Sequence, residues 1–382
     1  MKPEIKNLKK AASRILKAAK NKEKIIIYGD ADLDGITSVV ILKDTIKNIG
    51  GEIADIYFPN REKEGHGITQ SALKYLKKHV PALLISLDCG IGNYEEIKTA
   101  NEIGFEVIIV DHHEVIGEVP EASIVVDPKQ KGDEYPFKDF ANVGLAFKLS
   151  QVLLKKKMTE ALKKDFLELV ALATIADMVP RVDENKEMIA EGLASLESSW
   201  RPGIQASMNL KEIKELNLME KISKINSFLN IRDVKDRMPA AYRLLTALTE
   251  KEAGKLVRRL FKKGIEKRAK IGEIAEEVRK RIFGKSADPI IFEGDSDWEL
   301  PLLGVVASIL VKECKKPVFL YKKQKVESQG SIRASSEFNL VKALEKCSEN
   351  LSTYGGHPKA AGFRVKNEYL EDFEKCLFKH FK

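Results

Sequence analysis

Short apolar runs alternate with longer helical patterns through the first third of the chain. The runs cover residues 24–28, 53–58, 82–87, 106–110 and 124–126. Such alternation is typical of βαβ units around a mostly parallel sheet. Because the runs are almost continuously apolar, we expect helices on both faces of that sheet. The pattern therefore predicts an α/β domain whose ligands bind outside the carboxyl ends of the strands.

A helical and highly charged region follows, from about residue 185 to 283. Apolar residues in its last part recur at mostly four-residue steps, which predicts one long helix packed along a single stripe. These residues are Leu256, Leu260, Ile265, Ala269, Ile274, Val278 and Ile282. The strand and helix alternation then returns, with strands expected at 289–292, 317–321 and 325–334 and a helix near 302–312. We expect a first domain at 1–190, a helical connector at 191–285 and a smaller α/β domain at 286–382.

Acidic and imidazole side chains stand where the predicted strands end. A triplet of aspartates follows the first run, one aspartate follows the third, and an Asp-His-His sequence follows the fourth. A further aspartate ends a helical segment just before Pro180. In chain order these residues are Asp30, Asp32, Asp34, Asp88, Asp111, His112, His113 and Asp177. Separate segments thus deliver metal-binding groups to one edge of the predicted sheet.

Carboxylates gathered in this way repel one another unless a cation holds them together. Oxygen and imidazole ligands suit Mn²⁺ or Mg²⁺ better than a soft metal, and the carboxylates suffice for two ions. Two ions about 4 Å apart activate water and stabilise the leaving oxygen of a phosphoester. The expected chemistry is hydrolysis of a phosphoester or phosphoanhydride.

Each member of the set has a structural alternative. Asp30 is a suitable helix cap, Asp88 before Cys-Gly is a suitable turn residue, and His113 is suited to orienting its neighbour. A metal site explains all the positions together, whereas the alternatives require an independent coincidence at each one.

The charge balance favours a polyanionic partner. The chain has 65 Lys and Arg against 57 Asp and Glu, a net charge of +8. Nucleic acid fits this excess, although a Lys-rich thermophilic protein has a similar composition. The basic residues of the long helix, such as Arg258, Arg259 and Lys262, either track a phosphate backbone or form a solvated face that nearby Glu residues neutralise.

Cysteine spacing and the N-terminus indicate a reduced, cytoplasmic protein. Cys89, Cys314, Cys347 and Cys376 lie far apart without zinc-type pairs, so we expect no structural disulfide. Residues 1–24 are Lys-rich and resemble an amphipathic helix rather than a signal peptide. Because no segment approaches the ~20 apolar residues of a membrane span, we expect no membrane association.

These motifs resemble a known family. The stretches at 30–38 (DADLDGITS), 88–90 (DCG), 111–113 (DHH) and 176–177 (AD) are similar to the four ordered motifs of the DHH phosphoesterase superfamily. The stretch at 355–362 (GGHPKAAG) resembles the glycine-rich signature of its DHH-associated C-terminal domain. Others look like the RecJ branch of single-strand exonucleases, archaeal-type members included: 58–61 (FPNR), 65–67 (GHG), 127–130 (DPKQ), 135–138 (YPFK), 144–148 (GLAFK), 304–308 (GVVAS) and 331–333 (SIR).

The resemblance implies a role for each motif residue. Asp32, Asp34, Asp88, His112 and Asp177 would bind two Mn²⁺ or Mg²⁺ ions, with Asp34 and Asp88 shared and Asp30 as an additional ligand. His113 and Asp111 would act at the scissile phosphate. Substrate phosphate would be held by residues of the C-terminal domain, namely Ser331, Arg333, Gly355, Gly356 and His357. A cleft between the two domains would admit a single strand.

One position departs from part of the superfamily. The pyrophosphatase and small-oligonucleotide branches resemble a His-x-x-x-Asp-x-Asp opening, and Tyr28 occupies the place of that histidine. A phenol with a pKa of about 10 is a poor metal ligand at neutral pH. Asp30 is the residue that we expect to replace it, which leaves the number of bound ions open.

The expected activity is an exonuclease that releases mononucleotides from single-stranded DNA, RNA or both, in replication or repair. The alternatives are a phosphodiesterase for short oligonucleotides or cyclic dinucleotides, and a non-catalytic replication scaffold. The resemblance also implies a protein partner, either a replisome protein of the GINS type or a repair helicase.

Overall fold

The computed structural model describes residues 3–61, 63–115, 117–231, 233–284 and 287–381. Contacts divide the chain into two compact units, Met1–Lys262 and Lys263–Lys382. The helical residues 191–262 therefore pack with the first unit. The three-part division expected from the sequence stays a prediction.

The first unit is built on a five-stranded parallel sheet, as its alternating pattern predicts. The strand order is β2-β1-β3-β4-β5. The strands are β1 (Ile25–Gly29), β2 (Ile53–Tyr57), β3 (Ala82–Leu87), β4 (Phe105–Val110) and β5 (Ile124–Val126). Strand β2 lies on one side of β1, and β3, β4 and β5 follow on the other side. The carboxyl end of β1 is therefore a topological switch point, where such sheets bind ligands.

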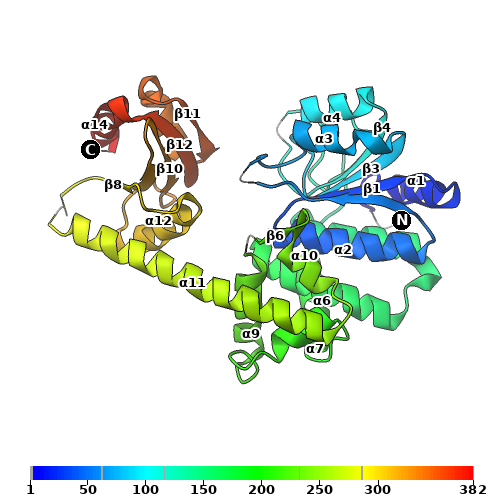
Figure 1. The fold of residues 1–382 in the computed structure, drawn as a ribbon. Coiled ribbons are helices and arrows are strands. Elements are labelled where there is room, and N and C mark those ends of the chain that lie inside the picture. The colour runs from blue at the N-terminus through cyan, green and yellow to red at the C-terminus, as the bar shows by residue number, and fades with distance from the viewer. Residues whose placement is uncertain (1–2, 62, 116, 232, 285–286, 382) are drawn as a thin grey trace. The chain divides into compact units, whose positions relative to one another are not determined.

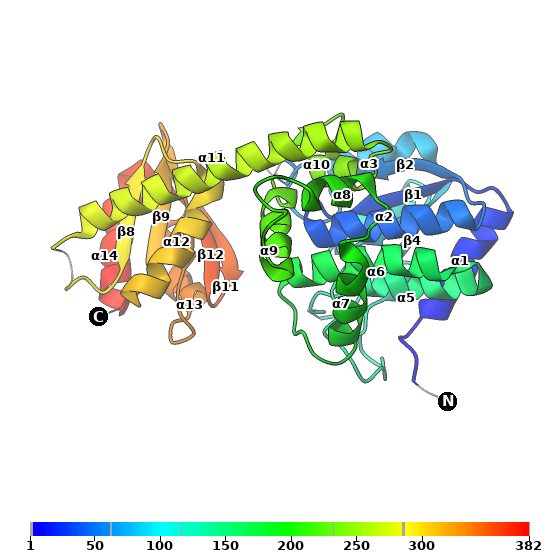
Figure 2. The same cartoon turned by 90° about the horizontal axis from the view of Figure 1, so that it is seen from below.

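Helices cover both faces of this sheet (Figures 1 and 2). Alternate strand residues point to opposite faces, so Ile25 and Ile27 pack in one core while Ile26 and Tyr28 pack in another. The first core also contains side chains of α1 (Leu8–Lys20), α2 (Leu33–Asn48), α5 (Asn142–Leu154) and α6 (Glu160–Asp177). The second contains those of α3 (Gln70–Leu76) and α4 (Tyr94–Glu102).

The rest of the first unit is mainly helical. It contains α7 (Asp183–Leu196), α8 (Pro202–Met208), α9 (Leu218–Leu229) and α10 (Ala240–Leu245). A small hairpin of β6 (Val234–Lys235) and β7 (Met238–Pro239) interrupts the helices, which the sequence pattern did not predict. The predicted long helix is α11 (Glu250–Ile282), a single helix of 33 residues that runs from the first unit into the second.

The second unit is a smaller α/β domain with a mixed sheet in the order β11-β12-β10-β9-β8. Its strands are β8 (Ile291–Asp295), β9 (Val318–Lys323), β10 (Glu327–Arg333), β11 (Thr353–His357) and β12 (Ala360–Lys366). One face packs on α11 and α12 (Leu300–Cys314), and the other on α13 (Leu340–Lys346) and α14 (Leu370–Phe381). Short 3₁₀ turns lie at Lys77–His79, Lys155–Lys157, Ser348–Asn350 and Asn367–Tyr369. The predicted fold class is therefore confirmed.

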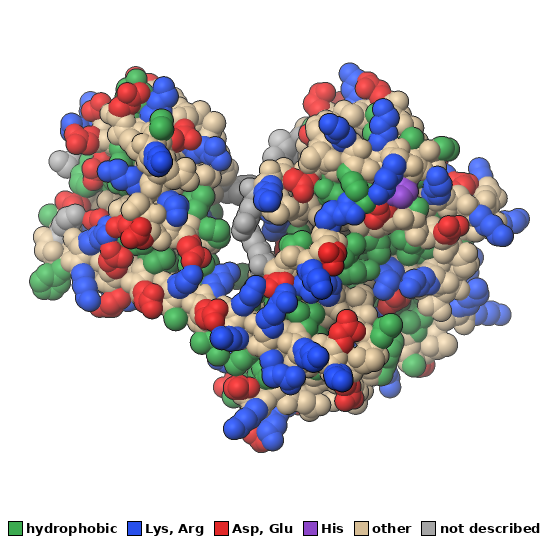
Figure 3. All heavy atoms as spheres, in the orientation of Figure 1, with side chains coloured by type: hydrophobic (Ala, Val, Ile, Leu, Met, Phe, Trp, Pro, Cys, Tyr) green, Lys and Arg blue, Asp and Glu red, His purple; other side chains and the backbone are tan. Residues whose placement is uncertain are grey.

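The face of the molecule seen in Figure 3 carries both signs of charge intermixed. In the second half of α11, Lys270 pairs with Glu299, and Arg279 pairs with Glu276 and Glu313. These contacts favour a neutralised, solvated face for this part of the helix over a track for phosphates. Among the described residues, no helix combines the length and the apolar character that a membrane span needs.

The expectation of no disulfide is wrong. Cys347, at the end of α13, is bonded to Cys376 of α14, with their Cα atoms 5.9 Å apart. The two cysteines are 29 residues apart in the sequence, and only the packing of α13 against α14 brings them together. Wide spacing along a chain therefore gives no evidence against pairing.

Reduction of this disulfide should destabilise the second unit. Closing a loop of 29 residues removes conformational entropy from the unfolded chain that corresponds to about 3–4 kcal/mol. We expect a reducing agent to lower the thermal midpoint of the second unit in calorimetry. The double variant Cys347→Ala/Cys376→Ala should show the lower midpoint with or without reductant. A wild-type midpoint that is insensitive to reductant would show that the bond does not form.

A buried ion-pair cluster joins the sheet domain to the helices that follow it. The guanidinium group of Arg201 contacts Asp165 of α6 at 2.5 and 2.6 Å and Asp44 of α2 at 2.9 Å. It also donates to the carbonyl oxygen of Leu245 at 3.1 Å. Both Arg201 and Asp165 are almost completely buried. Either charge would be costly to leave alone in this place.

Replacement of Arg201 should therefore destabilise the first unit strongly. Arg201→Met leaves the Asp165 carboxylate buried without its cation, at an expected cost of about 3–5 kcal/mol in the free energy of unfolding. Urea denaturation followed by circular dichroism measures it. Lys163→Met, which breaks the solvent-exposed pair with Glu191, is the control and should cost less than about 1 kcal/mol. Equal effects of the two variants would contradict a structural role for the Arg201 cluster.

Candidate metal centre

The predicted metal-binding residues meet at the carboxyl edge of the first sheet. Asp30 follows β1, Asp88 follows β3, and His112 follows β4 by two residues. Asp32 is the N-cap of α2 and accepts a hydrogen bond from Gly35 N at 3.1 Å. A β-carbon at Gly35 would lie 2.4 Å from the carbonyl oxygen of Asp30, so this turn requires glycine. Local strand and turn structure thus places the carboxylates side by side.

Asp34 binds the start of helix α5 with both of its oxygens. It accepts hydrogen bonds from Asn142 N at 2.7 Å and from Val143 N at 2.8 Å. These are free N–H groups at a helix N-terminus, which favours a negative charge. Burial and the nearby Asp177 and Asp32 carboxylates nevertheless raise the pKa of Asp34 well above its ordinary value. The helix terminus therefore does not fully compensate the charge.

The side chains of Asp88 and His112 bring polar atoms close together without forming a hydrogen bond between them. Asp88 Oδ1 lies 3.2 Å from His112 Nε2, but the two are not aligned as a hydrogen bond. Within the described residues neither atom has a hydrogen-bond partner, although both are buried. Burial lowers the pKa of His112 to about 4, so the imidazole is neutral near pH 7 and keeps a lone pair for a metal.

The amide of Asn142 connects the ends of two strands. With its oxygen toward Asp88 N and its nitrogen toward Val110 O, both contacts are 2.9 Å. Asp88 has a φ of 63°, in the left-handed region that few residues other than glycine adopt. The amide therefore supports a strained backbone that aims the Asp88 carboxylate. Sequence reasoning missed Asn142.

Asp111 and His113 form a separate pair next to the cluster. Asp111 accepts hydrogen bonds from Ile91 N at 3.0 Å and His112 N at 2.8 Å, and its Oδ1 lies 2.7 Å from His113 Nδ1. That contact raises the pKa of His113. The Asp111 carboxylate thus orients the ring of His113. The imidazole of His113 is half-exposed, and its Nε2 faces away from this contact and can bind a substrate.

Asp177, the last residue of α6, completes the cluster. Its Oδ2 lies 4.0 Å from His112 Nε2, and Asp34 Oδ2 lies 3.7 Å from the same nitrogen. Burial and then the charge of Asp32 raise the pKa of Asp177. The Asp32 carboxylate therefore raises the pKa of both Asp34 and Asp177.

Asp30 and Asp32 have a cationic partner within the protein. The guanidinium group of Arg61 makes a two-pronged contact with Asp30, in which Nε lies 2.8 Å from Oδ1 and Nη2 contacts Oδ2. The same Nη2 lies 2.8 Å from Asp32 Oδ2. Arg61 occurs in the RecJ-like stretch 58–61, but sequence reasoning gave it no role. Ligation of a metal by Asp30 stays a prediction.

The donor set fits a hard divalent cation. Three groups of side chains have ligand atoms within 4.8 Å of one another: Asp88 with His112 and His113, Asp34 with His112 and Asp177, and Asp30 with Asp32 and Asp88. Carboxylate oxygens with one or two imidazoles suit Mn²⁺ and Mg²⁺. The orphaned Asp88 Oδ1 and His112 Nε2 are polar atoms that such an ion would satisfy.

The predicted substrate residues of the second unit gather on one part of its sheet. Ser331 and Gly355 both lie opposite Gly362, in one row across β10, β12 and β11. Arg333 of β10 lies two residues beyond Ser331 and donates to Ile332 O at 2.8 Å. A β-carbon at Gly304 of α12 would lie 2.8 Å from Arg333 Nη2, so that glycine makes room for the guanidinium group.

Phosphate binding by the two glycines of β11 and by Ser331 stays a prediction. Gly356 has a φ of 140°, and a β-carbon there would lie 2.4 Å from Ala360 O, so the strand requires glycine. The backbone of His357 ends β11, but its side chain lies outside the part of the chain that the structure describes.

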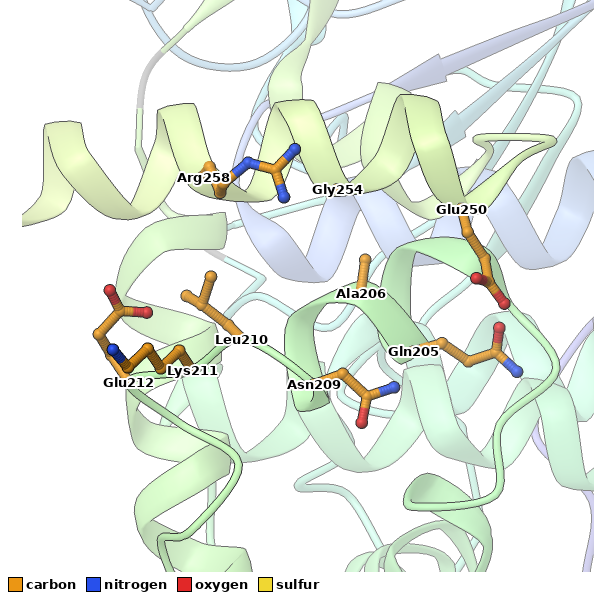
Figure 4. Close-up of a pocket in the computed structure, with 9 residues that line it drawn as sticks. All are labelled: Gln205, Ala206, Asn209, Leu210, Lys211, Glu212, Glu250, Gly254 and Arg258. Atoms are coloured by element: carbon orange, nitrogen blue, oxygen red, sulfur yellow. The ribbon is translucent and has the colours of Figure 1, made fainter.

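A separate cavity of about 380 Å³ lies in the first unit between α8 and the start of α11 (Figure 4). It is lined by Gln205, Ala206, Asn209, Leu210, Lys211, Glu212, Glu250, Gly254 and Arg258. None of the predicted site residues lines it, and its two cationic side chains are balanced by two carboxylates. The cavity offers no charge preference and is distinct from the metal centre.

Comparison with known proteins identifies both units. Residues 24–174 match the N-terminal domain of the DHH family, and residues 287–381 match the DHHA1 domain. The chain contains a DHH-family domain and a DHHA1 domain. Its two characteristic domains coincide with the two sheets described above, and the first match contains every predicted metal residue except Asp177.

The relatives of this DHH protein include single-stranded-DNA-specific exonucleases named RecJ. The Bacillus subtilis protein is 35% identical over 98% of this chain and 48% of its own length. The Thermus thermophilus protein is 29% identical over 99% of this chain and 54% of its own length. The chain thus spans about half the length of these curated relatives.

A crystal structure of exonuclease RecJ bound to manganese has a similar fold. The TM-score is 0.84 at 26% sequence identity, over 99% of this chain and 94% of the other. RecJ from Thermus thermophilus in complex with Mn²⁺ has a TM-score of 0.82 at 24% identity, over 98% of this chain and 55% of the other. The RecJ-like architecture is thereby shown.

The unpaired Asp88 carboxylate should make the metal-free protein less stable than it would be without that charge. Asp88→Asn keeps the shape and tolerates a left-handed backbone, so we expect it to raise the thermal midpoint of the protein in EDTA. Wild type should gain about 2.7 kcal/mol from Mn²⁺ at a hundredfold excess over its Kd, and the variant should lose most of this gain. Thermal melts measure both. An unchanged response of the variant to Mn²⁺ would contradict ligation by Asp88.

Proposed function

We propose that this protein is a metal-dependent exonuclease that releases mononucleotides from single-stranded DNA. The observation that carries the proposal is the cluster of Asp34, Asp88 and His112, whose buried polar atoms converge without satisfying one another. The names of its RecJ relatives supply the substrate class. The net charge of +8 supports a polyanionic substrate.

Asp32, Asp34, Asp88, His112 and Asp177 are the residues that we propose to hold Mn²⁺ or Mg²⁺. Asp88 belongs to two of the three ligand groups, which supports two ions with a shared carboxylate. Bound there, divalent ions would lower the pKa of a water molecule and stabilise negative charge on the leaving oxygen. Asp34 and Asp88 are the proposed shared carboxylates, because both are buried next to other carboxylates.

His113 would act on the substrate rather than on the metal. Its Nδ1 is engaged with Asp111, and this pairing raises the pKa of His113. This pairing favours the protonated imidazole, which can donate a hydrogen bond from Nε2 to an oxygen of the scissile phosphate. Asp111 keeps the ring oriented through this step, in the manner of a carboxylate behind a catalytic histidine.

The second unit would bind the strand through Ser331, Arg333, Gly355, Gly356 and His357. Ser331 and Gly355 share a row of the sheet, and Arg333 lies at the end of the same strand as Ser331. Burial lowers the pKa of Arg333, so its charge is incompletely solvated. A phosphate group would supply the missing counter-charge.

The nuclease activity should depend on Asp88. We expect Asp88→Ala to lower hydrolysis of single-stranded DNA with Mn²⁺ by more than about 100-fold, since loss of even an outer partner of a metal ligand costs 10–100-fold. The control is Glu187→Ala, which removes an exposed carboxylate from α7 and should keep full activity. Unchanged hydrolysis by the purified Asp88 variant would place the activity elsewhere.

The same assay should compare single strands of DNA and RNA, labelled separately at each end, with di- and trinucleotides. Progressive shortening from one end of the long strand is the expected result. Cleavage of only the short substrates would replace the proposal with a small-substrate phosphodiesterase. Absence of hydrolysis with either metal would favour a non-catalytic role.

We include a protein partner in the proposal, either a GINS-type replisome protein or a repair helicase. Its support is the RecJ-like sequence alone. Affinity purification from the native cell should recover one of these classes, and recovery of neither would remove the partner from the proposal.

A further inference from the structure

A loop carries Arg61 to the edge of the metal centre. This Arg61 loop consists of residues 58–69, of which all but residue 62 are described, and it connects β2 to α3. Arg61 contacts both Asp30 and Asp32. A loop of this length has considerable freedom, so the position of its guanidinium group depends on what fixes the loop.

Tyr28 fixes one side of the Arg61 loop from within the sheet. Its ring is fully buried at the end of β1, and its hydroxyl donates to the carbonyl oxygen of Gly67 at 2.9 Å. Burial raises the pKa of this phenol further above its ordinary value, so it remains a neutral donor. Tyr28 stands where part of the superfamily has a histidine, but its polar atom is committed to the loop.

Glu64 fixes the loop from inside. Its carboxylate accepts hydrogen bonds from Tyr57 Oη at 2.8 Å, Asn60 N at 3.1 Å and Ser71 Oγ at 3.0 Å. Burial disfavours the charged form, but the hydrogen bonds from Tyr57 and Asn60 outweigh it and lower the pKa of Glu64. The rings of Tyr28 and Tyr57 are stacked, with centroids 5.4 Å apart, so the tyrosine that donates to Glu64 packs directly against Tyr28.

A third contact limits the end of the loop. Ile68 N donates to Asn93 Oδ1 at 3.0 Å, and a β-carbon at Gly67 would lie 2.4 Å from the same oxygen. Gly67 has a φ of 79°, so this turn requires glycine. The loop is therefore bound to β1, β2 and the start of α4 by separate hydrogen bonds.

We propose that Tyr28 and Glu64 are positioning residues that hold Arg61 at the Asp30 and Asp32 edge of the metal centre, where its guanidinium group contacts a substrate phosphate. The inference rests on the proposed nuclease function for the identity of the substrate. It assigns Asp30 to Arg61 as a permanent counter-charge. Asp32 is shared, because its Oδ2 faces Arg61 while its carboxylate belongs to the predicted ligand set.

The test begins with Tyr28→Phe, which keeps the stacked ring and removes only the hydroxyl. We expect the KM for a single-stranded DNA oligonucleotide to rise about 5–10-fold, the scale of one buried hydrogen bond, with kcat within about twofold. Hydrogen exchange of the peptide spanning the Arg61 loop should become faster. The Kd for Mn²⁺, measured by electron paramagnetic resonance without substrate, should stay within about twofold.

A second background shows whether the effect passes through Arg61. In Arg61→Ala protein, Tyr28→Phe should leave KM within about twofold, because the group that it positions is absent. An equally large rise of KM in that background would overturn the proposal. So would a roughly tenfold weaker Mn²⁺ affinity with unchanged loop exchange, since Tyr28 would then act on the metal.

Two further variants complete the design. Tyr94→Phe removes another tyrosine hydroxyl that donates to a backbone carbonyl, that of Glu118 at 2.6 Å, and should change neither KM nor exchange of the Arg61 loop. Glu64→Gln should reproduce the faster exchange of the loop. If wild type fails to degrade single strands, the proposed function fails, whereas the exchange of the Arg61 loop still decides whether Tyr28 and Glu64 hold it.

Discussion

Uncompensated negative charge at one edge of a sheet is the constraint on which this structure depends. Burial raises the pKa of Asp34, Asp88 and Asp177, and neighbouring carboxylates raise it further: Asp177 and Asp32 act on Asp34, Asp34 and Asp32 act on Asp88, and Asp32 acts on Asp177. The surrounding protein compensates only part of this charge. Two N–H groups of α5 donate to Asp34, and the guanidinium group of Arg61 contacts Asp30 and Asp32. The charge that is left suits a divalent metal. The fold thus keeps a high-energy arrangement in place through contacts that lie outside the cluster itself.

The sequence was sufficient for the parts of the molecule that follow from local periodicity. Apolar runs ending in Asp30, Asp88 and Asp111 correctly predicted both the parallel strands and the edge at which the acidic groups meet. The four-residue stripe predicted a single long helix, which is α11. The DHH-like motifs predicted the family, which the comparisons confirm. These features could be predicted because the strand, the turn and the functional side chain lie within a few residues of one another.

The rest depends on contacts between distant positions. Asp34 meets Asn142 across 108 residues, and Asp30 meets Arg61 across 31. Cys347 and Cys376 pair across 29 residues because two helices pack together, and nothing in their spacing indicates it. The role of Tyr28 was equally hidden, since the sequence shows which residue replaces a histidine but not that its hydroxyl reaches Gly67. A single sequence provides the candidate ligands, whereas the groups that orient them appear only in three dimensions.

The two buried aspartates of the cluster are unequal in what their loss would do to the fold. Asp34 accepts hydrogen bonds from the first N–H groups of α5 with both oxygens. A substitution there would therefore remove contacts that hold a core helix as well as a proposed metal ligand. Asp88 leaves one oxygen without a partner among the described residues, and its removal relieves repulsion. A descendant released from selection for catalysis would therefore discard Asp88 readily while retaining Asp34 as scaffolding. Persistence of the first aspartate motif in an inactive homologue would then record architecture rather than chemistry.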